Sequence, residues 1–309
     1  MYIGIDLGGT NIDAGLVSEE GVITLRKSIP TRAERGSAEV IKDIIRLIKM
    51  LSESNSVQSI GVGVPGTVIR EKGIVNFACN INFHNVHLVH ELNQQFDFPV
   101  YLDNDANCAA LGEAVCGAAE NFDTSLMVTI GTGIGGGFVI NNRIYRGFNG
   151  AAGEIGHMVI ETKGLDCACG RKGCFEKYAS SSALVEEAKR KFKNQGDTIL
   201  QDMTSGNIDK LNGEMIFSAA KQGDHFSLSL IDRYTFYLSE GLANLISIFE
   251  PEIMVIGGAI CRQGEYLLTP LREKVYNNIY SRTLPKTKIK ASVLGSDSGI
   301  IGASQLWRG

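Results

Sequence analysis

Residues 131–145 read GTGIGGGFVINNRIY, and the way this stretch folds decides between two classes of protein. Its first part, Gly131 to Gly136, has the spacing of the dinucleotide-binding fingerprint, and Glu154 follows near the distance expected of a ribose-binding acid. That fingerprint requires its glycines to open a helix. The residues that follow, FVINNRIY, are instead typical of two short strands joined by an Asn-Asn turn. The stretch therefore disfavours a nicotinamide-dependent oxidoreductase and predicts a glycine-rich hairpin.

The same order of elements occurs at the start of the chain. There too a strand, a glycine turn, a strand, a tight turn and a strand follow one another, so two similar domains, each built on a sheet, are expected. Apolar residues at helical spacing predict a helix between positions 40 and 51, and the alternation of strands and helices indicates an α/β fold with a cleft between its halves. The predicted strands are 2–6, 11–17, 22–29, 59–66, 100–103, 125–130, 138–142 and 143–147, and further helices are predicted at 88–96, 106–119 and 227–249.

The composition is that of a globular protein. Of the 309 residues, 44% are hydrophobic and 21% are charged, which is enough to bury a sizeable core. A formal net charge of -4 and the lack of a dense basic stripe argue against a nucleic-acid partner. Apolar runs are far shorter than the roughly 20 residues of a membrane span. The amino-terminal MYIGIDLGGT has no features of an export signal, so we expect a cytoplasmic protein without membrane attachment.

The first glycine turn, Asp6-Leu7-Gly8-Gly9-Thr10-Asn11, offers backbone N–H groups and a threonine hydroxyl where a strand reverses. Such groups can face phosphate oxygens, although an ordinary hairpin turn explains the same residues. The turn at Gly131 repeats these features in the other half of the chain. Two such hairpins fit a nucleoside triphosphate clamped between lobes, and the absence of a GxxxxGK[ST] motif excludes a P-loop enzyme.

The tripeptide Asp103-Asn104-Asp105 lies where a predicted strand ends and a helix begins. Asp and Asn are favoured at helix starts whatever the function, so Asp105 as a helix cap is one interpretation. The other is a functional carboxylate, because the end of this strand is expected to reach the cleft.

Residues 167–174 read CACGRKGC, and a histidine precedes them. His157, Cys167, Cys169 and Cys174 supply the four ligands of a tetrahedral Cys3His zinc site, and the glycines between them allow a tight knuckle. A redox pair would more usually be C-x-x-C, which is absent. In a reducing compartment disulfides are not expected, and the odd total of seven cysteines agrees. The stretch therefore predicts a zinc knuckle.

DLGGTN at 6–11, the run GTGIGGGFVINNRIYRGFNGAAGEIGH at 131–157, and CACGRKGC followed by Phe-Glu resemble the ROK family, most nearly its bacterial glucokinases. The resemblance implies the two-lobed fold of the sugar kinase, heat-shock-protein and actin superfamily, that is, an actin-like ATPase fold with a zinc knuckle. The implied lobes are a small one of residues 1–117 plus 297–309 and a large one of 118–296. The implied reaction is transfer of the γ-phosphoryl group of Mg-ATP to the 6-hydroxyl of glucose.

The resemblance also implies roles for individual residues. Asp105 is similar to the catalytic base, and Asp6 to an aspartate that orients Mg²⁺. His157 would serve both zinc and sugar, one ring nitrogen facing each. The implied sugar-binding residues are Gly66, Asn104, Asp105, Glu154, His157 and Glu176. The implied nucleotide-binding residues are Asp6, Gly8, Gly9, Thr10, Asn11, Thr132, Gly133, Gly257 and Gly258.

Two departures from the family pattern concern specificity. Asn11 stands where many relatives have Lys, and Phe83 stands where glucokinases often have Trp. Glu154 supports a glucose-type site, but N-acetylmannosamine, N-acetylglucosamine, allose, mannose and fructose stay open as acceptors. A sugar sensor without kinase activity is a further alternative, although a first strand at Tyr2 is expected to leave no room for a DNA-reading module. The resemblance suggests a homodimer.

Overall fold

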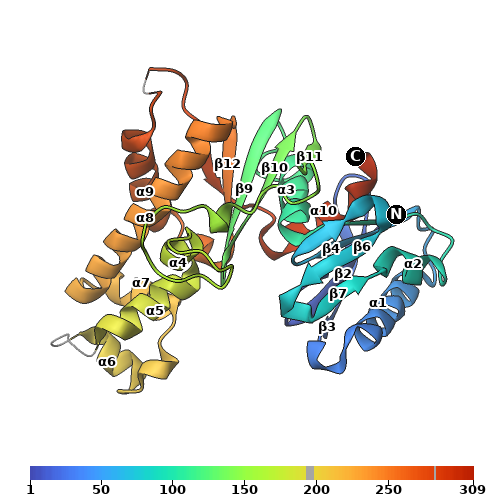
Figure 1. Ribbon diagram of the computed structural model, residues 1–309, viewed down its shortest axis with the longest axis horizontal. Helices are drawn as coiled ribbons and strands as arrows, with labels where there is room; N and C mark the ends of the chain where they lie inside the picture. The colour runs from blue at the N-terminus through green and yellow to red at the C-terminus, as the bar shows by residue number, and fades with distance from the viewer. Residues whose placement is uncertain (193–197, 282) are drawn as a thin grey trace. The chain divides into compact units, whose positions relative to one another are not determined.

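The computed structural model describes residues 1–192, 198–281 and 283–309. The chain divides into two compact units (Figure 1). The first unit comprises residues 1–127, 136–153 and 292–309, and the second comprises 128–135 and 154–291. The division expected from the resemblance ran instead between residues 117 and 118 and between 296 and 297. The observed first unit also includes 118–127, 136–153 and 292–296, because these segments make their tertiary contacts there.

The first unit begins with strands and is completed by the C-terminal helix. Its strands are β1 (Tyr2–Leu7), β2 (Asn11–Val17), β3 (Ile23–Pro30), β4 (Ser59–Val64), β5 (Thr67–Ile69), β6 (Ile74–Ala78), β7 (Phe83–Val86), β8 (Val100–Asn104) and β11 (Arg143–Tyr145). Its α-helices are α1 (Ser37–Ser52), α2 (Leu88–Asn93), α3 (Asp105–Cys116) and α10 (Ser298–Ser304). Strands β9 (Thr124–Ile130) and β10 (Ile134–Ile140) each contain a boundary between the units.

The second unit is mostly helical. It contains α4 (Glu176–Ala179), α5 (Ser181–Phe192), α6 (Ile199–Thr204), α7 (Gly213–Lys221), α8 (His225–Phe249) and α9 (Glu265–Asn278), with strands β12 (Ile253–Gly257) and β13 (Lys288–Ala291). A 3-10 turn at Ile155–His157 contains the candidate His157, and another at Ala259–Gln263 directly follows the candidate Gly258. Across the described residues, no helix combines the length and the apolar composition that crossing a membrane requires.

The predicted duplication of topology is confirmed. One five-stranded sheet has the order β3-β2-β1-β4-β8, and the other has the order β11-β10-β9-β12-β13. When the strands of each sheet are numbered in chain order, both sheets have the same spatial order: third, second, first, fourth, fifth. The glycine run at 131–136 leads into β10, not into a helix, which confirms the hairpin interpretation. A smaller sheet has the order β5-β6-β7.

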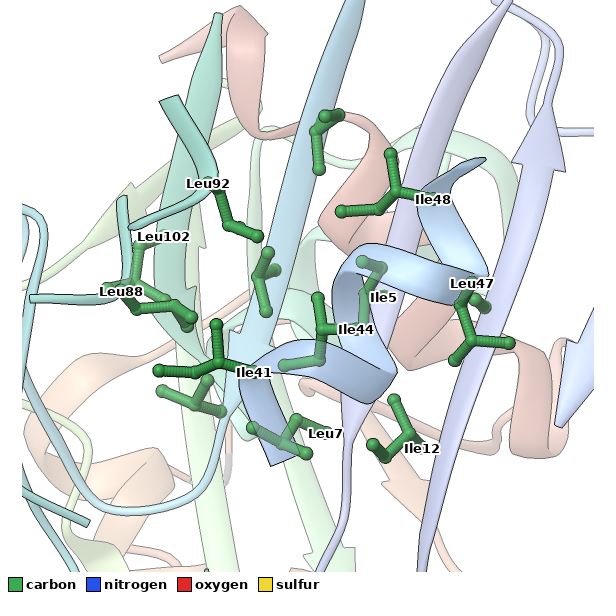
Figure 2. Close-up of a cluster of buried hydrophobic side chains, with 14 of the residues drawn as sticks. Ile5, Leu7, Ile12, Ile41, Ile44, Leu47, Ile48, Leu88, Leu92 and Leu102 are labelled. Atoms are coloured by element: carbon green, nitrogen blue, oxygen red, sulfur yellow. The ribbon is translucent and has the colours of Figure 1, made fainter. Parts of the chain in front are cut away.

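The core of the first unit lies between its helices and the first sheet. Helix α1 buries Val40, Ile44 and Ile48 at helical spacing, as its sequence predicts. Figure 2 shows Ile44 and Ile48 of α1 gathered with Ile5 and Leu102 from the strands and with leucines from α2. Each buried Ile or Leu contributes about 1.5–3 kcal/mol relative to an exposed one, so this cluster stabilises the strand ends that carry the candidate site.

Helix α10 approaches the first sheet and α3 at backbone distance. A Cβ atom on Gly302 would lie 1.6 Å from the carbonyl oxygen of Cys108, and one on Gly61 would lie 1.8 Å from that of Ala303. Only glycine permits this approach, because any side chain would overlap backbone atoms that cannot move away. The C-terminal helix is thereby held against β4 and α3.

A buried carboxylate ties the end of α3 to the segment where the chain returns to the first unit. Glu113 accepts hydrogen bonds from the Ala118 N–H (2.8 Å), the Leu294 N–H (3.1 Å) and the Ser292 hydroxyl. Its side chain is 1% exposed. The backbone N–H groups of Ala118 and Leu294 thus have a hydrogen-bond acceptor within the protein and need none from solvent.

Candidate functional site

Three parallel strands of the first sheet end at the same edge. The register aligns Asp6 of β1 with Gly63 of β4, and Gly63 with Asp103 of β8. In sheets of this type, ligands bind outside the carboxyl ends of the strands. The edge therefore brings together Asp6, the turn at Gly66 that follows β4, and Asp105 at the start of α3.

The cap of α3 is Asn104, not Asp105. The Asn104 side-chain oxygen accepts from the backbone N–H groups of Ala106 (2.9 Å) and Asn107 (3.2 Å). Its amide nitrogen donates to the carbonyl oxygen of Gly66 at 3.0 Å. Asp105 is the first residue of the helix, and its Oδ1 lies 2.8 Å from the Ala106 N–H. The interpretation of Asp105 as a mere helix cap is therefore wrong, since its neighbour performs that function.

Both polar ends of Asn104 are thus in use within the protein. The oxygen accepts two hydrogen bonds, which fills its two lone pairs, and one of the two amide N–H groups points to Gly66. One N–H group is left with which Asn104 can donate to a ligand. Gly66 has a φ of 82°, and a Cβ atom there would lie 2.1 Å from the carbonyl oxygen of Phe77. Glycine is required at this turn for both reasons.

Asp6 lies in a strongly negative environment. The pKa of this carboxyl group is raised to about 7, mainly by burial and then by the carboxylates of Asp105 and Asp13, while Arg26 acts in the opposite direction. Helix α10 packs against this carboxyl group. A Cβ atom at Gly299 of α10 would lie 2.4 Å from the Asp6 Oδ2 atom, so position 299 leaves room only for glycine. Asp6 and Asp105 are therefore close enough to interact electrostatically.

The first glycine turn is an ordered hairpin. The Gly8 N–H donates to the Asn11 carbonyl at 2.9 Å, and the Thr31 hydroxyl donates to the Gly8 carbonyl at 2.6 Å. Gly9, Thr10 and Asn11 are exposed. The exposed backbone and hydroxyl can therefore face an anion, as the sequence predicts.

Sequence reasoning gave no role to Asp103 or Arg146, which form an ion pair at the end of β8. The Arg146 Nε atom lies 2.6 Å from the Asp103 Oδ2 atom, and Asp103 is 4% exposed. Asp103 directly precedes the candidates Asn104 and Asp105, and Arg146 lies within the run 131–157 that carries the family resemblance. An Asp directly before Asn104-Asp105 was the available signal, but nothing local indicates a partner 43 positions away.

Two of the candidate nucleotide-binding segments of the second unit, 132–133 and 257–258, lie at or just after the ends of β9 and β12. Gly258 has a φ of 96°, and a Cβ atom there would lie 2.1 Å from the carbonyl oxygen of Ile130 at the end of β9. Gly257 ends β12, and the Gly131 carbonyl accepts from the Ser181 N–H at 2.9 Å. A pocket of about 410 Å³ opens beside this glycine turn, lined among others by Ser181, Phe217, Lys221, Ile260 and Arg262. Its size is in the range of small-molecule sites.

The predicted metal ligands come together. One ligand atom from each of His157, Cys167, Cys169 and Cys174 lies within 4.8 Å of the others. The Cys169 and Cys174 sulfurs are 3.6 Å apart, and the Cys167 sulfur is 3.7 Å from His157 Nδ1. Sulfurs about 2.3 Å from a tetrahedral zinc ion lie about 3.8 Å apart, so the donor set fits zinc.

The pKa values of the thiols in this cluster are shifted in opposite directions. Burial raises the pKa of Cys167 to about 12, whereas a hydrogen bond from the Arg171 backbone lowers that of Cys169. A bound cation would favour the thiolate forms.

Glu176, the first residue of α4, contacts the cysteine cluster and lies against the glycine turn at Gly133. Its Oε1 atom lies 3.3 Å from the Cys167 sulfur and 3.6 Å from His157 Nδ1. A Cβ atom at Gly133 would lie 2.7 Å from Glu176 Oε2. Thr132 and Glu154 are exposed in the same unit. The second unit thus groups Glu176, His157 and the turn at Gly133.

Comparison with known proteins shows the family to which the chain belongs. The chain matches the ROK family over residues 2–309. It is 40% identical to a glucokinase of Thermotoga maritima, over 98% of this chain and 96% of that protein. It is 33% identical to the xylose repressor of Bacillus subtilis, over 98% of this chain and 76% of that protein. The solved structure of a ROK family glucokinase from Streptomyces griseus, in complex with glucose and AMPPNP, has a TM-score of 0.86 at 35% identity and covers 100% of this chain and 99% of its own.

Proposed function

Because this chain belongs to the ROK family, we propose that it transfers the γ-phosphoryl group of Mg-ATP to the 6-hydroxyl of glucose. The fold is the actin-like ATPase fold of the ROK sugar kinases. Similarity over the full length to several glucokinases supports glucose as the acceptor. The structural observation that carries the proposal is the carboxylate of Asp105, which begins α3 at the carboxyl edge of β1, β4 and β8.

Asp105 is proposed as the base. A sugar hydroxyl has a pKa near that of water, about 15.7, and a carboxylate has one near 3.9. Complete proton transfer before attack would cost about 16 kcal/mol, at 1.36 kcal/mol per unit. Asp105 therefore orients the hydroxyl and accepts its proton late, as the new phosphorus–oxygen bond develops. Most of the acceleration then comes from positioning and from neutralisation of phosphate charge.

The phosphates are proposed to contact the glycine turns at Gly8–Asn11 and at Thr132–Gly133. The pocket beside Gly257 and Gly258 is proposed for the base and ribose of the nucleotide. Asp6 would orient Mg²⁺, and its negative surroundings fit a divalent cation. When bound, Mg²⁺ neutralises charge that develops on the transferred phosphoryl group.

We propose Gly66, Asn104, Glu154, His157 and Glu176 as sugar-binding residues. His157 supports a double role, because its Nδ1 atom faces the cysteine cluster while Nε2 is left for a sugar hydroxyl. Cys167, Cys169 and Cys174 with His157 are proposed to hold a structural zinc ion, which would fix the ring. Zinc would thereby control the geometry of the substrate without taking part in the reaction.

A panel of hexoses tests the proposal. Zinc-loaded protein is incubated with Mg-ATP and each sugar, and ADP release is measured. Turnover with glucose is expected to exceed that with mannose, fructose, allose, N-acetylmannosamine and N-acetylglucosamine. Turnover confined to one of the other sugars would keep the mechanism and refute glucose as the acceptor.

A second candidate is a sugar sensor without kinase activity. The 33% identity to a xylose repressor favours considering it. Glucose binding without ADP release across the whole panel is the result that would establish it. The homodimer implied by the resemblance is a separate prediction, to be tested by light scattering coupled to size-exclusion chromatography.

A further inference from the structure

We infer that Arg146, acting through Asp103, is a positioning residue for Asp105. The inference rests on the proposed function, in which Asp105 is the base. It concerns residues of the first unit only, and it starts from a buried ion pair that the proposed reaction does not use directly.

The ion pair is short and largely shielded from water. Arg146 Nε lies 2.6 Å from Asp103 Oδ2, with the two side chains 19% and 5% exposed. Arg146 is itself held in place, because its Nη1 donates to the Ile144 carbonyl and its Nη2 to the Gly309 carbonyl, each at 3.3 Å. The guanidinium group is therefore anchored by backbone oxygens as well as by Asp103.

The second oxygen of Asp103 clamps the turn that carries Asp105. Asp103 Oδ1 accepts from the Asn104 N–H at 2.8 Å and from the Asn107 Nδ2 at 2.8 Å. It thereby ties the last residue of β8 to the first turn of α3. Asp105 lies between the two tied residues, so a rotation of the Asp103 carboxylate would shift the backbone from which Asp105 projects.

Arg146 is also one of the cations that act on a group of carboxylates. Burial raises the pKa of the neighbouring Cys108 thiol, the carboxylates of Asp103, Asp6 and Asp105 raise it further, and Arg146 acts in the opposite direction. Without Arg146, the buried carboxylate of Asp103 would lose its ion-pair partner beside two other acids, although Arg70 also interacts with it electrostatically.

A role in stability alone explains this arrangement poorly. Buried ion pairs are weak contributors to stability, since apolar residues of similar volume often do as well or better. What a paired carboxylate with both oxygens engaged does provide is a fixed orientation. Here that orientation is fixed one residue before the cap of α3 and two residues before the proposed base.

The test compares Arg146→Met and Arg146→Lys with Arg272→Met. Arg272 is a matched control, because it also pairs with a carboxylate (Glu265, 2.6 Å) and donates to a backbone carbonyl (Ile289, 2.9 Å), but it belongs to α9. Turnover is measured per folded molecule, glucose affinity by calorimetry, and amide hydrogen exchange across α3.

For Arg146→Met we expect kcat to fall at least tenfold while the glucose Kd stays within about threefold. The Ala106 and Asn107 amides should exchange at least tenfold faster. Arg146→Lys should recover part of the lost kcat, because it keeps the cation, and Arg272→Met should keep both kcat and the exchange rates. If Arg146→Met does not fold, the test is the comparison of Arg146→Lys with the wild type. In that comparison we expect kcat to fall severalfold and the glucose Kd to stay unchanged.

An unchanged kcat and unchanged amide exchange in the Arg146 variants would overturn the inference. So would an equal loss of kcat in Arg272→Met. Failure of the proposed function is distinguishable, because it would appear as a wild-type protein without turnover. The exchange of the α3 amides would still decide whether Arg146 orders this turn.

Discussion

Glu176 Oε1 lies 3.6 Å from His157 Nδ1, and it lies 3.3 Å from the sulfur of Cys167. A carboxylate proposed to bind the sugar is therefore in contact with the cluster proposed to bind zinc. Any change in that cluster would displace two sugar-binding candidates at once, which links the metal to substrate affinity.

The first prediction concerns removal of zinc. Cys169→Ser, or treatment with a strong chelator, should lower glucose affinity at least tenfold, because His157 and Glu176 lose their fixed orientation. Bound metal and glucose affinity are measured on the same samples, by emission spectrometry and calorimetry. Cys116→Ser, which changes a thiol outside the cluster, is the control and should retain both. Full glucose affinity in metal-free protein would contradict the link.

The second prediction concerns the proposed base. Asp105→Asn should keep the glucose Kd within a few fold and reduce kcat by at least about 100-fold, the lower end expected for loss of a general base. The amide has nearly the same size but cannot accept the proton. Steady-state ADP release and calorimetry separate the two quantities. Substantial residual phosphoryl transfer would remove Asp105 from this role.

The third prediction concerns the close approach of α10 to α3. Gly302→Ala should lower the free energy of unfolding by at least about 3 kcal/mol, because its Cβ atom would overlap the Cys108 carbonyl oxygen, 1.6 Å away. Gly213→Ala is the control, because no atom lies within 4 Å of its added Cβ. It should be neutral or stabilising by up to about 1 kcal/mol, since alanine favours a helix. Urea unfolding measures both, and equal stabilities would refute the packing argument.

The fourth prediction concerns pH. The pKa of Asp6 is raised from 3.8 to about 7 in the folded protein, so the folded state holds this proton more tightly than the unfolded state. The stability contributed by the protonated group is complete below about pH 4 and is lost as pH rises to about 7. Without nucleotide or Mg²⁺, the wild type should therefore lose up to about 4 kcal/mol relative to Asp6→Asn across this range, at 1.36 kcal/mol per unit. Urea unfolding at pH 4.5, 6 and 8 measures the difference, and a constant difference would contradict the raised pKa.

Patterns within short segments were enough to predict much of the fold. The helical spacing of Val40, Ile44 and Ile48 predicts α1, and the hairpin after Gly131 was recognised because strands, not a helix, follow it. The four proposed metal ligands were found for the same reason, since they lie within 18 consecutive residues. Each of these features depends on neighbours along the chain, where spacing alone limits the geometry.

Other features depend on residues that are distant in sequence. Asn104, not Asp105, caps α3, and its amide nitrogen donates to the Gly66 carbonyl 38 positions away, a contact that no local pattern marks. The unit boundaries at 127 and 135 fall inside β9 and β10, and the one at 291 falls at the end of β13, where no local signal marks them.

By itself, the sequence determined the α/β order, the duplicated topology, the glycine turns and the cysteine knuckle. These follow from periodicity and from residues with special backbone or ligand chemistry. Only the tertiary structure decided that Arg146 meets Asp103, that Glu113 accepts from Leu294, and that Gly302 lies against Cys108. These contacts arise when sheets and helices bury their apolar faces, and burial sets distances between residues without leaving a local pattern in the chain.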